Sequence, residues 1–225
     1  ISPLIQRPER DFFPLEGVEV TVGDASTRTD EYGHYSLSLS AAGKRIVTFL
    51  KPGFVPAHKT LDAPYNAPYQ VDAVMFSEQE FQKVDPSKDV NVEMADAGLT
   101  AGPDSFIVKG QGTKATTANI SVTPFDPTNE RQLKAFPGEF SGKASDGTET
   151  SIETFGFAKL QVKDDSGQKL DLAPGKTADL KIPIASSLND SSPDTIPLWY
   201  FDENQGTWLE RGKAVKICDG NECYY

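Results

Sequence analysis

Apolar and polar residues alternate along much of the chain. Residues 18–22 and 35–39 place apolar side chains at every second position, and residues 46–50, Ile-Val-Thr-Phe-Leu, form a nearly continuous apolar run. A period of two predicts a strand with one buried face, whereas a short apolar run predicts a strand buried on both faces. The first part of the sequence therefore predicts a series of short strands.

The same pattern continues beyond residue 89. Clusters of Asp, Asn, Gly and Pro separate the strand signals and mark turns, and the 16 prolines disfavour long helices. Such a series of short strands is typical of antiparallel sandwiches, so we expect an all-β protein. The strand signals in this part lie at residues 90–94, 106–108, 120–124, 158–162, 170–172, 178–184 and 198–201.

One short helix is expected at residues 77–83. Ser77 and Glu80 form a capping-box pattern at its start, and Pro86 would prevent it from continuing much further.

The polar stretch at residues 85–89 is the best candidate for a domain boundary, because it contains few apolar residues. We predict two tandem antiparallel β-sandwiches, at residues 1–86 and 87–225, joined by a short linker. The second would end in a hairpin whose Trp199 and Trp208 pack in the core.

The charge balance bears on the possible partners. Lys and Arg number 22 and Asp and Glu number 33, so the formal net charge is −11. This charge opposes binding to a phosphate backbone or an anionic lipid surface, and the lysines are scattered singly among acids. No apolar run is long enough to cross a bilayer. We expect no nucleic-acid partner and no membrane insertion within this chain.

The chain has two cysteines, Cys218 and Cys223, on either side of Asp-Gly and Asn residues that favour a tight turn. We expect them to form a disulfide. A metal site with two thiolates is the alternative, but zinc needs further ligands, and His34 and His58 lie far upstream. A disulfide would indicate an oxidising compartment, and hence an extracellular or cell-envelope location.

Residues 14–20 read Pro-Leu-Glu-Gly-Val-Glu-Val, residues 29–35 read Thr-Asp-Glu-Tyr-Gly-His-Tyr, and Lys-Pro-Gly-Phe follows at residues 51–54. This series resembles the carboxypeptidase regulatory-like domain, a transthyretin-like or Ig-like sandwich. The resemblance implies a hairpin turn made by Asp30 and Gly33. It specifies a fold and no chemistry, and such domains serve as spacers or binding modules in secreted and surface proteins.

The second part ends with Ile-Pro-Leu-Trp-Tyr-Phe-Asp at residues 196–202 and Gly-Thr-Trp-Leu-Glu-Arg-Gly at residues 206–212. With the motifs before it, this segment resembles the extracellular β-rich segment of cartilage intermediate layer proteins and of bacterial secreted relatives. It is distantly similar to the sandwiches of ankyrins and netrin receptors. Some distant relatives cleave themselves at a His-Phe-Ser triplet, which this sequence lacks, so self-cleavage is not expected.

The sequence offers little catalytic chemistry. Neither His34 nor His58 belongs to the His-x-x-Glu pair of zinc carboxypeptidases, and Ser141 does not have nucleophile-elbow spacing. Residues 175–177 read Gly-Lys-Thr but lack the earlier glycine of a phosphate-binding loop. We expect that the protein is not an enzyme. A hydrolase that uses a pair of the 33 acidic residues is an alternative that the sequence leaves open.

Two sets of residues are candidates for binding. Asp202 and Asn204 belong to a turn that partly resembles a calcium loop but lacks its closing Glu, and a plain hairpin reversal is the other interpretation. No other cofactor is expected. Tyr65 and Tyr69 lie in a proline-punctuated loop that could present their rings to a glycan or a protein. Alternatively, the two rings cover the end of the sandwich.

These observations favour a non-catalytic structural or adhesive module of the extracellular space or cell envelope, which presents loops to a protein or glycan partner. The alternative is a pair of accessory β-domains of a larger secreted hydrolase.

Overall fold

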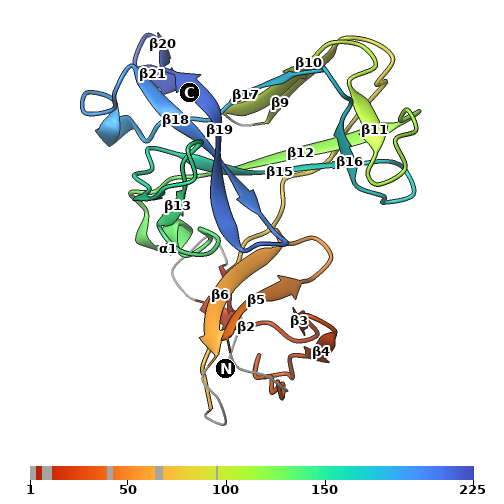
Figure 1. Cartoon of the computed structure of the whole chain (residues 1–225), viewed down its shortest axis with the longest axis vertical. Coiled ribbons are helices and arrows are strands. Elements are labelled where there is room, and N and C mark those ends of the chain that lie inside the picture. The colour runs from red at the N-terminus through yellow and green to blue at the C-terminus, as the bar shows by residue number, and fades with distance from the viewer. Residues whose placement is uncertain (1–3, 7–11, 40–42, 64–67, 95) are drawn as a thin grey trace. The chain divides into compact units, whose positions relative to one another are not determined.

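The computed structural model describes residues 4–6, 12–39, 43–63, 68–94 and 96–225. It is nearly all β, and most neighbouring strands pair antiparallel (Figure 1). The predicted fold class, all-β with antiparallel sheets, is therefore confirmed. Among the described residues, no helix is long and apolar enough to cross a membrane.

Contacts group the chain into two compact units that alternate along the sequence. Unit 1 and unit 2 each comprise three separate segments. The predicted division into sandwiches at residues 1–86 and 87–225 stays a prediction, because grouping by contacts does not test which segments fold independently. Unit 1 consists of Ile1–Ser77, Asn129–Thr154 and Thr195–Ala214, and unit 2 consists of Glu78–Thr128, Phe155–Asp194 and Val215–Tyr225.

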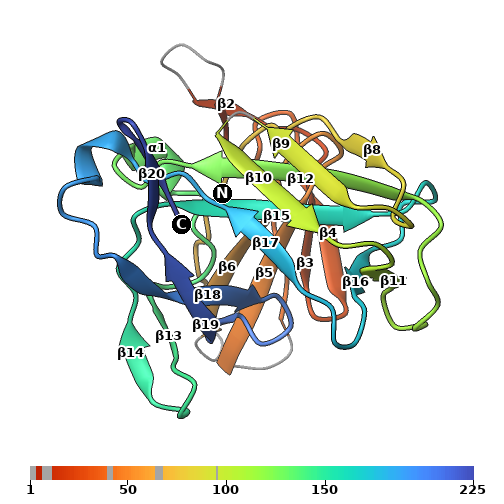
Figure 2. The same ribbon diagram turned by 90° about the horizontal axis from the view of Figure 1, so that it is seen from above.

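Within the described part of unit 2 the strands form four small sheets, with the strand orders β15-β12-β8, β17-β10-β9, β11-β16 and β20-β21. Figure 2 shows the long strands β12 and β15 side by side, in an antiparallel register from Asn119↔Lys163 to Phe125↔Phe157. The elements are β8 (Gln82–Val84), β9 (Val90–Met94), β10 (Ala97–Ala101), β11 (Phe106–Val108), β12 (Ala118–Phe125), β15 (Phe157–Lys163), β16 (Leu170–Leu172), β17 (Ala178–Lys181), the 3-10 helix η1 (Ser186–Leu188), β20 (Ile217–Asp219) and β21 (Glu222–Tyr224).

The core of unit 2 is formed by apolar side chains at alternate positions of these strands. Its central members come from β9, β10 and β12, as the period-two pattern predicted. The buried cluster consists of Val90, Val92, Ala97, Leu99, Ala101, Phe106, Ala118, Ile120, Val122 and Leu170.

The helix predicted at residues 77–83 is wrong. Gln82–Val84 is strand β8, and its residues pair with Ala118–Ile120 of β12. Ser77 forms an isolated bridge with Phe54. Backbone pairing with distant segments thus replaces the few hydrogen bonds that so short a helix could form, because an isolated helix of this length is marginal.

The described residues of unit 1 form three sheets, with the strand orders β4-β3-β5-β6, β2-β1-β7 and β14-β13-β19-β18. The pairs β1–β7 and β13–β19 are parallel. The elements are β1 (Leu4–Gln6), β2 (Phe12–Pro14), β3 (Glu19–Val22), β4 (Ala25–Arg28), β5 (Gly43–Leu50), β6 (Ala57–Ala63), β7 (Val74–Met75), the helical turn α1 (Glu130–Leu133), β13 (Ser141–Lys143), β14 (Glu149–Ser151), β18 (Thr195–Asp202) and β19 (Thr207–Val215).

The core of unit 1 joins the inner face of the β4-β3-β5-β6 sheet to Met75 of β7. The strands predicted at residues 18–22 and 46–50 supply half of its buried members. The buried cluster consists of Leu15, Val18, Val20, Val22, Val47, Phe49, Ala57, Leu61, Ala73 and Met75.

The strand predicted at residues 35–39 is only half right. Tyr35, Leu37 and Leu39 do pack against the core, but the described part of this segment is not a strand. The segment is held by a side-chain hydrogen bond and not by pairing with a neighbouring strand. The Tyr35 hydroxyl donates to the Val71 carbonyl at 2.8 Å.

The outer face of the β4-β3-β5-β6 sheet contacts the turn between β18 and β19. Side chains alternate along a strand, so Ile46 and Thr48 of β5, and His58 and Thr60 of β6, point away from the core. A Cβ atom on Gly206 would lie 2.6 Å from Cγ1 of Ile46 and 3.2 Å from Cγ2 of Thr60. Only a residue without a side chain fits at this point of the turn.

We expect Gly206→Ala to destabilise the protein more than Gly23→Ala. Both glycines have positive φ, +63° and +59°, but a Cβ on Gly23 would meet nothing within 4 Å. In each variant the free energy of unfolding should fall by roughly 1–2 kcal/mol, because alanine is unfavourable in the left-handed backbone conformation. Gly206→Ala should lose about 1–3 kcal/mol more through overpacking. Urea unfolding measures both, and equal losses would contradict the close approach of the turn to Ile46.

Candidate functional site

The first predicted binding loop lies between β6 and β7. Tyr65 lies outside the described residues. Tyr69 is 59% exposed, and its neighbours Pro68 and Gln70 are exposed as well. Tyr69 is therefore exposed to solvent, and its role in binding stays a prediction.

A second exposed tyrosine, Tyr32, was not predicted. It lies at the tip of the turn made by Asp30 and Gly33 and is 62% exposed. The Asp30 carboxylate accepts hydrogen bonds from the backbone N–H groups of Tyr32 and His34, at 2.9 and 2.8 Å, and Gly33 has φ +72°. The motif at residues 29–35 could have predicted this exposure, because a residue at the tip of so tight a turn points to solvent.

Tyr35 connects the two segments that carry these exposed rings. It follows the Tyr32 turn, its ring packs edge-on against Phe49 with centroids 5.7 Å apart, and its hydroxyl donates to the carbonyl of Val71, two residues after Tyr69. The turn and the loop are thereby anchored to each other and to the core.

The same environment perturbs the ionisation of Tyr35. Burial, and second the nearby negative charge of Asp72, raise the pKa of its hydroxyl to about 12. The phenol therefore stays protonated and able to donate to Val71 across the physiological range.

Asp202 and Asn204 lie in the turn that contacts the outer sheet face. Asp202 Oδ1 accepts from the backbone N–H groups of Asn204 and Gln205 at 2.8 and 3.0 Å, and Oδ2 accepts from the Gln205 side chain at 2.9 Å. Burial alone would raise the pKa of Asp202, but these hydrogen bonds outweigh it and hold the pKa below its usual value. The loop's own donors thus use both carboxylate oxygens, as in a plain hairpin reversal.

Asp side chains stabilise other turns in the same way. In the turn Asp164–Gln168, Asp164 Oδ1 accepts from the N–H groups of Ser166 and Gln168, each at 2.9 Å, which repeats the geometry of Asp30. The pKa of Asp164 is lowered, first by the hydrogen bond from the Ser166 side chain. Related Asx turns occur at Asp85, Asp126 and Asp146.

No group of three or more His, Cys, Asp or Glu side chains that could hold a metal ion occurs in the part of the chain that the structure describes. Calcium binding at Asp202 and Asn204 stays a prediction.

His58 belongs to a buried polar cluster that the sequence did not reveal. It is 5% exposed. Its Nδ1 lies 3.2 Å from Thr48 Oγ1, and its Nε2 lies 3.3 Å from Glu203 Oε1. This is ion-pair distance, yet Nε2 makes no hydrogen bond to any described residue. His58 is enclosed, whereas the Glu203 side chain is 29% exposed, and the pair lies where the turn between β18 and β19 contacts the sheet.

Aromatic rings extend this contact within unit 1. Phe201 lies 5.9 Å from the His58 ring and meets Trp208 edge-on at 5.4 Å, and Trp208 stacks on Phe136 at 4.7 Å. Trp208 is buried, as predicted, whereas Trp199 is only partly buried.

The predicted disulfide between Cys218 and Cys223 is confirmed. The two residues face each other across the β20–β21 hairpin.

We expect Tyr35→Phe to change the alkaline limb of the stability profile. The folded-state pKa of Tyr35, about 12, exceeds the usual value of 10.0, so its contribution is complete below pH 10 and is lost as the pH rises toward 12. Urea unfolding of the variant should therefore depend less on pH in this window. It should also show a loss of about 1 kcal/mol at pH 7 from the missing hydrogen bond. The half-exposed Tyr200 offers a control, Tyr200→Phe, and parallel profiles for wild type and Tyr35→Phe would refute the assignment.

Two substitutions separate a structural turn from a calcium site at residues 202–206. Asp202→Ala should lower the free energy of unfolding by about 1 kcal/mol, equally in calcium and in chelator, whereas Asn204→Ala should have little effect, because Asn204 contributes its backbone N–H. If calcium raises the melting temperature of wild type, and either substitution abolishes that rise, the turn is a calcium site after all.

Comparisons with family models, with curated proteins and with solved structures each return no match to this chain. The resemblances to the carboxypeptidase regulatory-like domain and to cartilage intermediate layer proteins stay predictions.

Proposed function

We propose that the chain is a non-catalytic structural or adhesive module of the extracellular space or cell envelope, which presents loops to a protein or glycan partner. The observation that carries this proposal is the pair of exposed tyrosines, Tyr32 and Tyr69, on segments anchored by the Tyr35–Val71 hydrogen bond. Exposed aromatic rings on a rigid support lose little conformational entropy when they bind, and they are common interface anchors.

The use of the acidic side chains supports a binding role over catalysis. Asp30, Asp164 and Asp202 each direct their carboxylate to backbone N–H groups of their own turn. Carboxylates committed in this way stabilise loops, and a general acid would instead need a raised pKa near the working pH. The resemblance to a spacer or binding domain points in the same direction.

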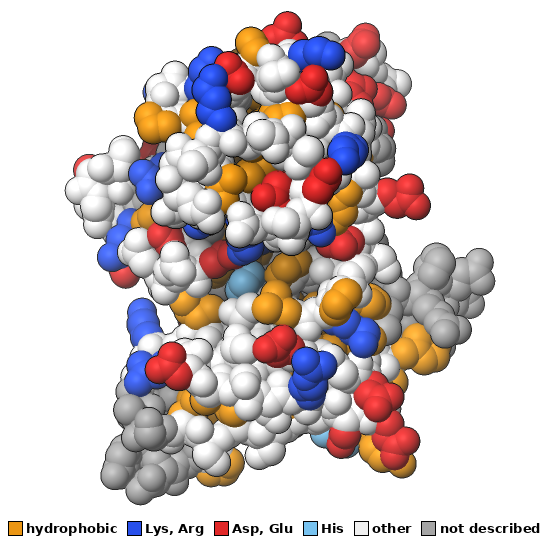
Figure 3. All heavy atoms as spheres, turned by 90° about the vertical axis from the view of Figure 1, so that its right-hand side faces the viewer, with side chains coloured by type: hydrophobic (Ala, Val, Ile, Leu, Met, Phe, Trp, Pro, Cys, Tyr) orange, Lys and Arg blue, Asp and Glu red, His pale blue; other side chains and the backbone are white. Residues whose placement is uncertain are grey.

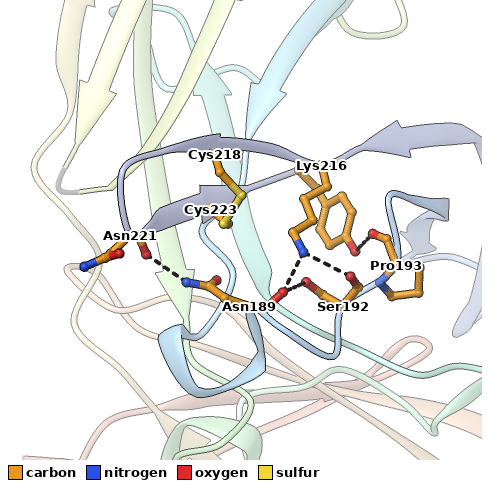
Figure 4. The surroundings of a disulfide bond; sticks show 8 residues. Asn189, Ser192, Pro193, Lys216, Cys218, Asn221 and Cys223 are labelled. Atoms are coloured by element: carbon orange, nitrogen blue, oxygen red, sulfur yellow. Dashed lines mark hydrogen bonds between the residues drawn. A yellow bond between two sulfur atoms is a disulfide. The ribbon is translucent and has the colours of Figure 1, made fainter.

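The surface charge and the disulfide are compatible with an extracellular binding module. On the face shown in Figure 3, acidic and basic side chains are interspersed, and neither sign forms a broad patch. This arrangement, with the net charge of −11, supports a partner other than nucleic acid. The Cys218–Cys223 bond, shown in Figure 4, is typical of an oxidising compartment. The role of an accessory region in a larger secreted enzyme stays the alternative hypothesis.

The proposal is tested with the fluorescently labelled chain on a glycan array and on an array of extracellular protein domains. We expect binding to at least one class, and a loss of affinity of roughly tenfold or more on Tyr32→Ala or Tyr69→Ala. Tyr200→Ala is the matched control, because Tyr200 is 49% exposed but lies on β18, and it should retain binding. Empty arrays, or equal losses in all three variants, would contradict the proposed tyrosine surface.

A further inference from the structure

The segment at residues 35–39 has the side-chain pattern of a strand but pairs with no neighbouring strand. Half-buried side chains that pack against the core of unit 1 alternate along it with exposed serines. The former are Tyr35, Leu37 and Leu39, and the latter are Ser36 and Ser38. This alternation indicates an extended backbone. Yet in the part of the chain that the structure describes, no strand forms a ladder with the segment.

The peptide groups of the segment have no backbone partners either. Among the described residues, the N–H and C=O groups of residues 35–39 make no hydrogen bond to another backbone group, whereas the turn just before them is closed by the bond from the Asp30 N–H to the His34 carbonyl at 2.9 Å. The segment is attached through the Tyr35 hydroxyl, which donates to Val71. Backbone donors and acceptors are strong, and folded proteins pair nearly all that they bury. A row of them is therefore left for a partner.

The segment lacks the features that protect a free strand edge. Natural edges carry charged side chains, prolines or bulges, or are covered by another element. Residues 35–39 read Tyr-Ser-Leu-Ser-Leu, without a charge or a proline, and the exposed side chains of Ser36 and Ser38 are small. The segment itself thus presents no steric or electrostatic obstacle to an added strand.

The inner side of the segment is held in place. The Tyr35 ring packs edge-on against Phe49, with centroids 5.7 Å apart, and Leu37 and Leu39 pack against the same buried cluster. A backbone that is already extended and supported loses little conformational entropy when it pairs, so less of the binding free energy is spent on ordering it.

We propose that residues 35–39 are a docking edge for an extended segment of a partner protein, which adds to it as a β-strand. The inference rests on the proposed binding function and specifies the partner. An extended polypeptide offers the regularly spaced N–H and C=O groups that match the unpaired row. A basic partner segment is favoured, because the chain has a net charge of −11 and Asp30 and Glu31 are exposed in the turn before the docking edge.

The test uses short linear peptides selected from a random phage-displayed library on the full chain, with the strongest binder then synthesised. Hydrogen–deuterium exchange is measured residue by residue, with and without this peptide. In the free chain the amides of residues 36–39 should exchange fast, because they donate to no backbone carbonyl of the described residues. In the complex, alternate amides, of residues 36 and 38 or of residues 37 and 39, should exchange roughly tenfold slower or more. The protection alternates because successive N–H groups of a strand point to opposite edges.

Two substitutions of one exposed serine separate backbone pairing from side-chain contact. Ser38→Ala keeps the N–H group and should bind the peptide as the wild type does. Ser38→Pro removes the N–H group and favours an extended backbone at Leu37. Its affinity should fall roughly tenfold if the amide of residue 38 is among the protected ones, and should not change if residues 37 and 39 are protected. The reverse combination would refute strand addition.

The outcomes distinguish this inference from the proposed function. A selected peptide that leaves the exchange of residues 36–39 unchanged overturns the docking edge. So does a library without a binder when the arrays identify a glycan partner. The proposed binding function survives both results. If the library and the arrays are all empty, both proposals fail.

Discussion

The close approach of Gly206 to Ile46 and Thr60 is the constraint on which unit 1 depends. It lets a turn from late in the sequence contact the sheet formed by β3 to β6 on the face opposite its core. His58 and Glu203 meet at the same contact, and Phe201 and Trp208 continue it toward Phe136. The sheet is thus supported on both faces, as its nearly continuous apolar run at residues 46–50 requires. A stable sheet in turn gives Tyr35 the rigid base from which the exposed Tyr32 and Tyr69 segments project.

The features that the sequence predicted well are those determined by neighbouring residues. Alternation at residues 18–22 and 90–94 identified strands because side-chain direction has a period of two in any strand. The turn at Asp30 and Gly33 was predictable because it depends on neighbouring residues only. The Asp30 carboxylate accepts from a backbone N–H two residues later, and Gly33 adopts a positive φ. The Cys218–Cys223 bond was predictable because only a tight turn separates the two residues.

The features that were missed depend on distant partners. Residues 77–83 carry a local helix signal, but Gln82–Val84 pairs with β12, and no pattern within the segment encodes that choice. His58 gave no sign of its burial, since Thr48 and Glu203 approach it from other elements. Of the two exposed tyrosines proposed for binding, the sequence singled out Tyr69 in the loop between β6 and β7, whereas Tyr32 in the turn at Asp30 and Gly33 was overlooked. The connection between their segments, from the Tyr35 hydroxyl to Val71, follows from the fold and not from spacing.

The alternation of the two units along the chain has a consequence for biosynthesis. Unit 1 needs residues up to Ala214, and unit 2 needs residues on both sides of that segment. Each unit therefore contains contacts between segments that are far apart in the sequence, and such contacts form slowly because a long stretch of chain must first be closed into a loop. The contacts of unit 1 cannot all be made before residues up to Ala214 have been synthesised.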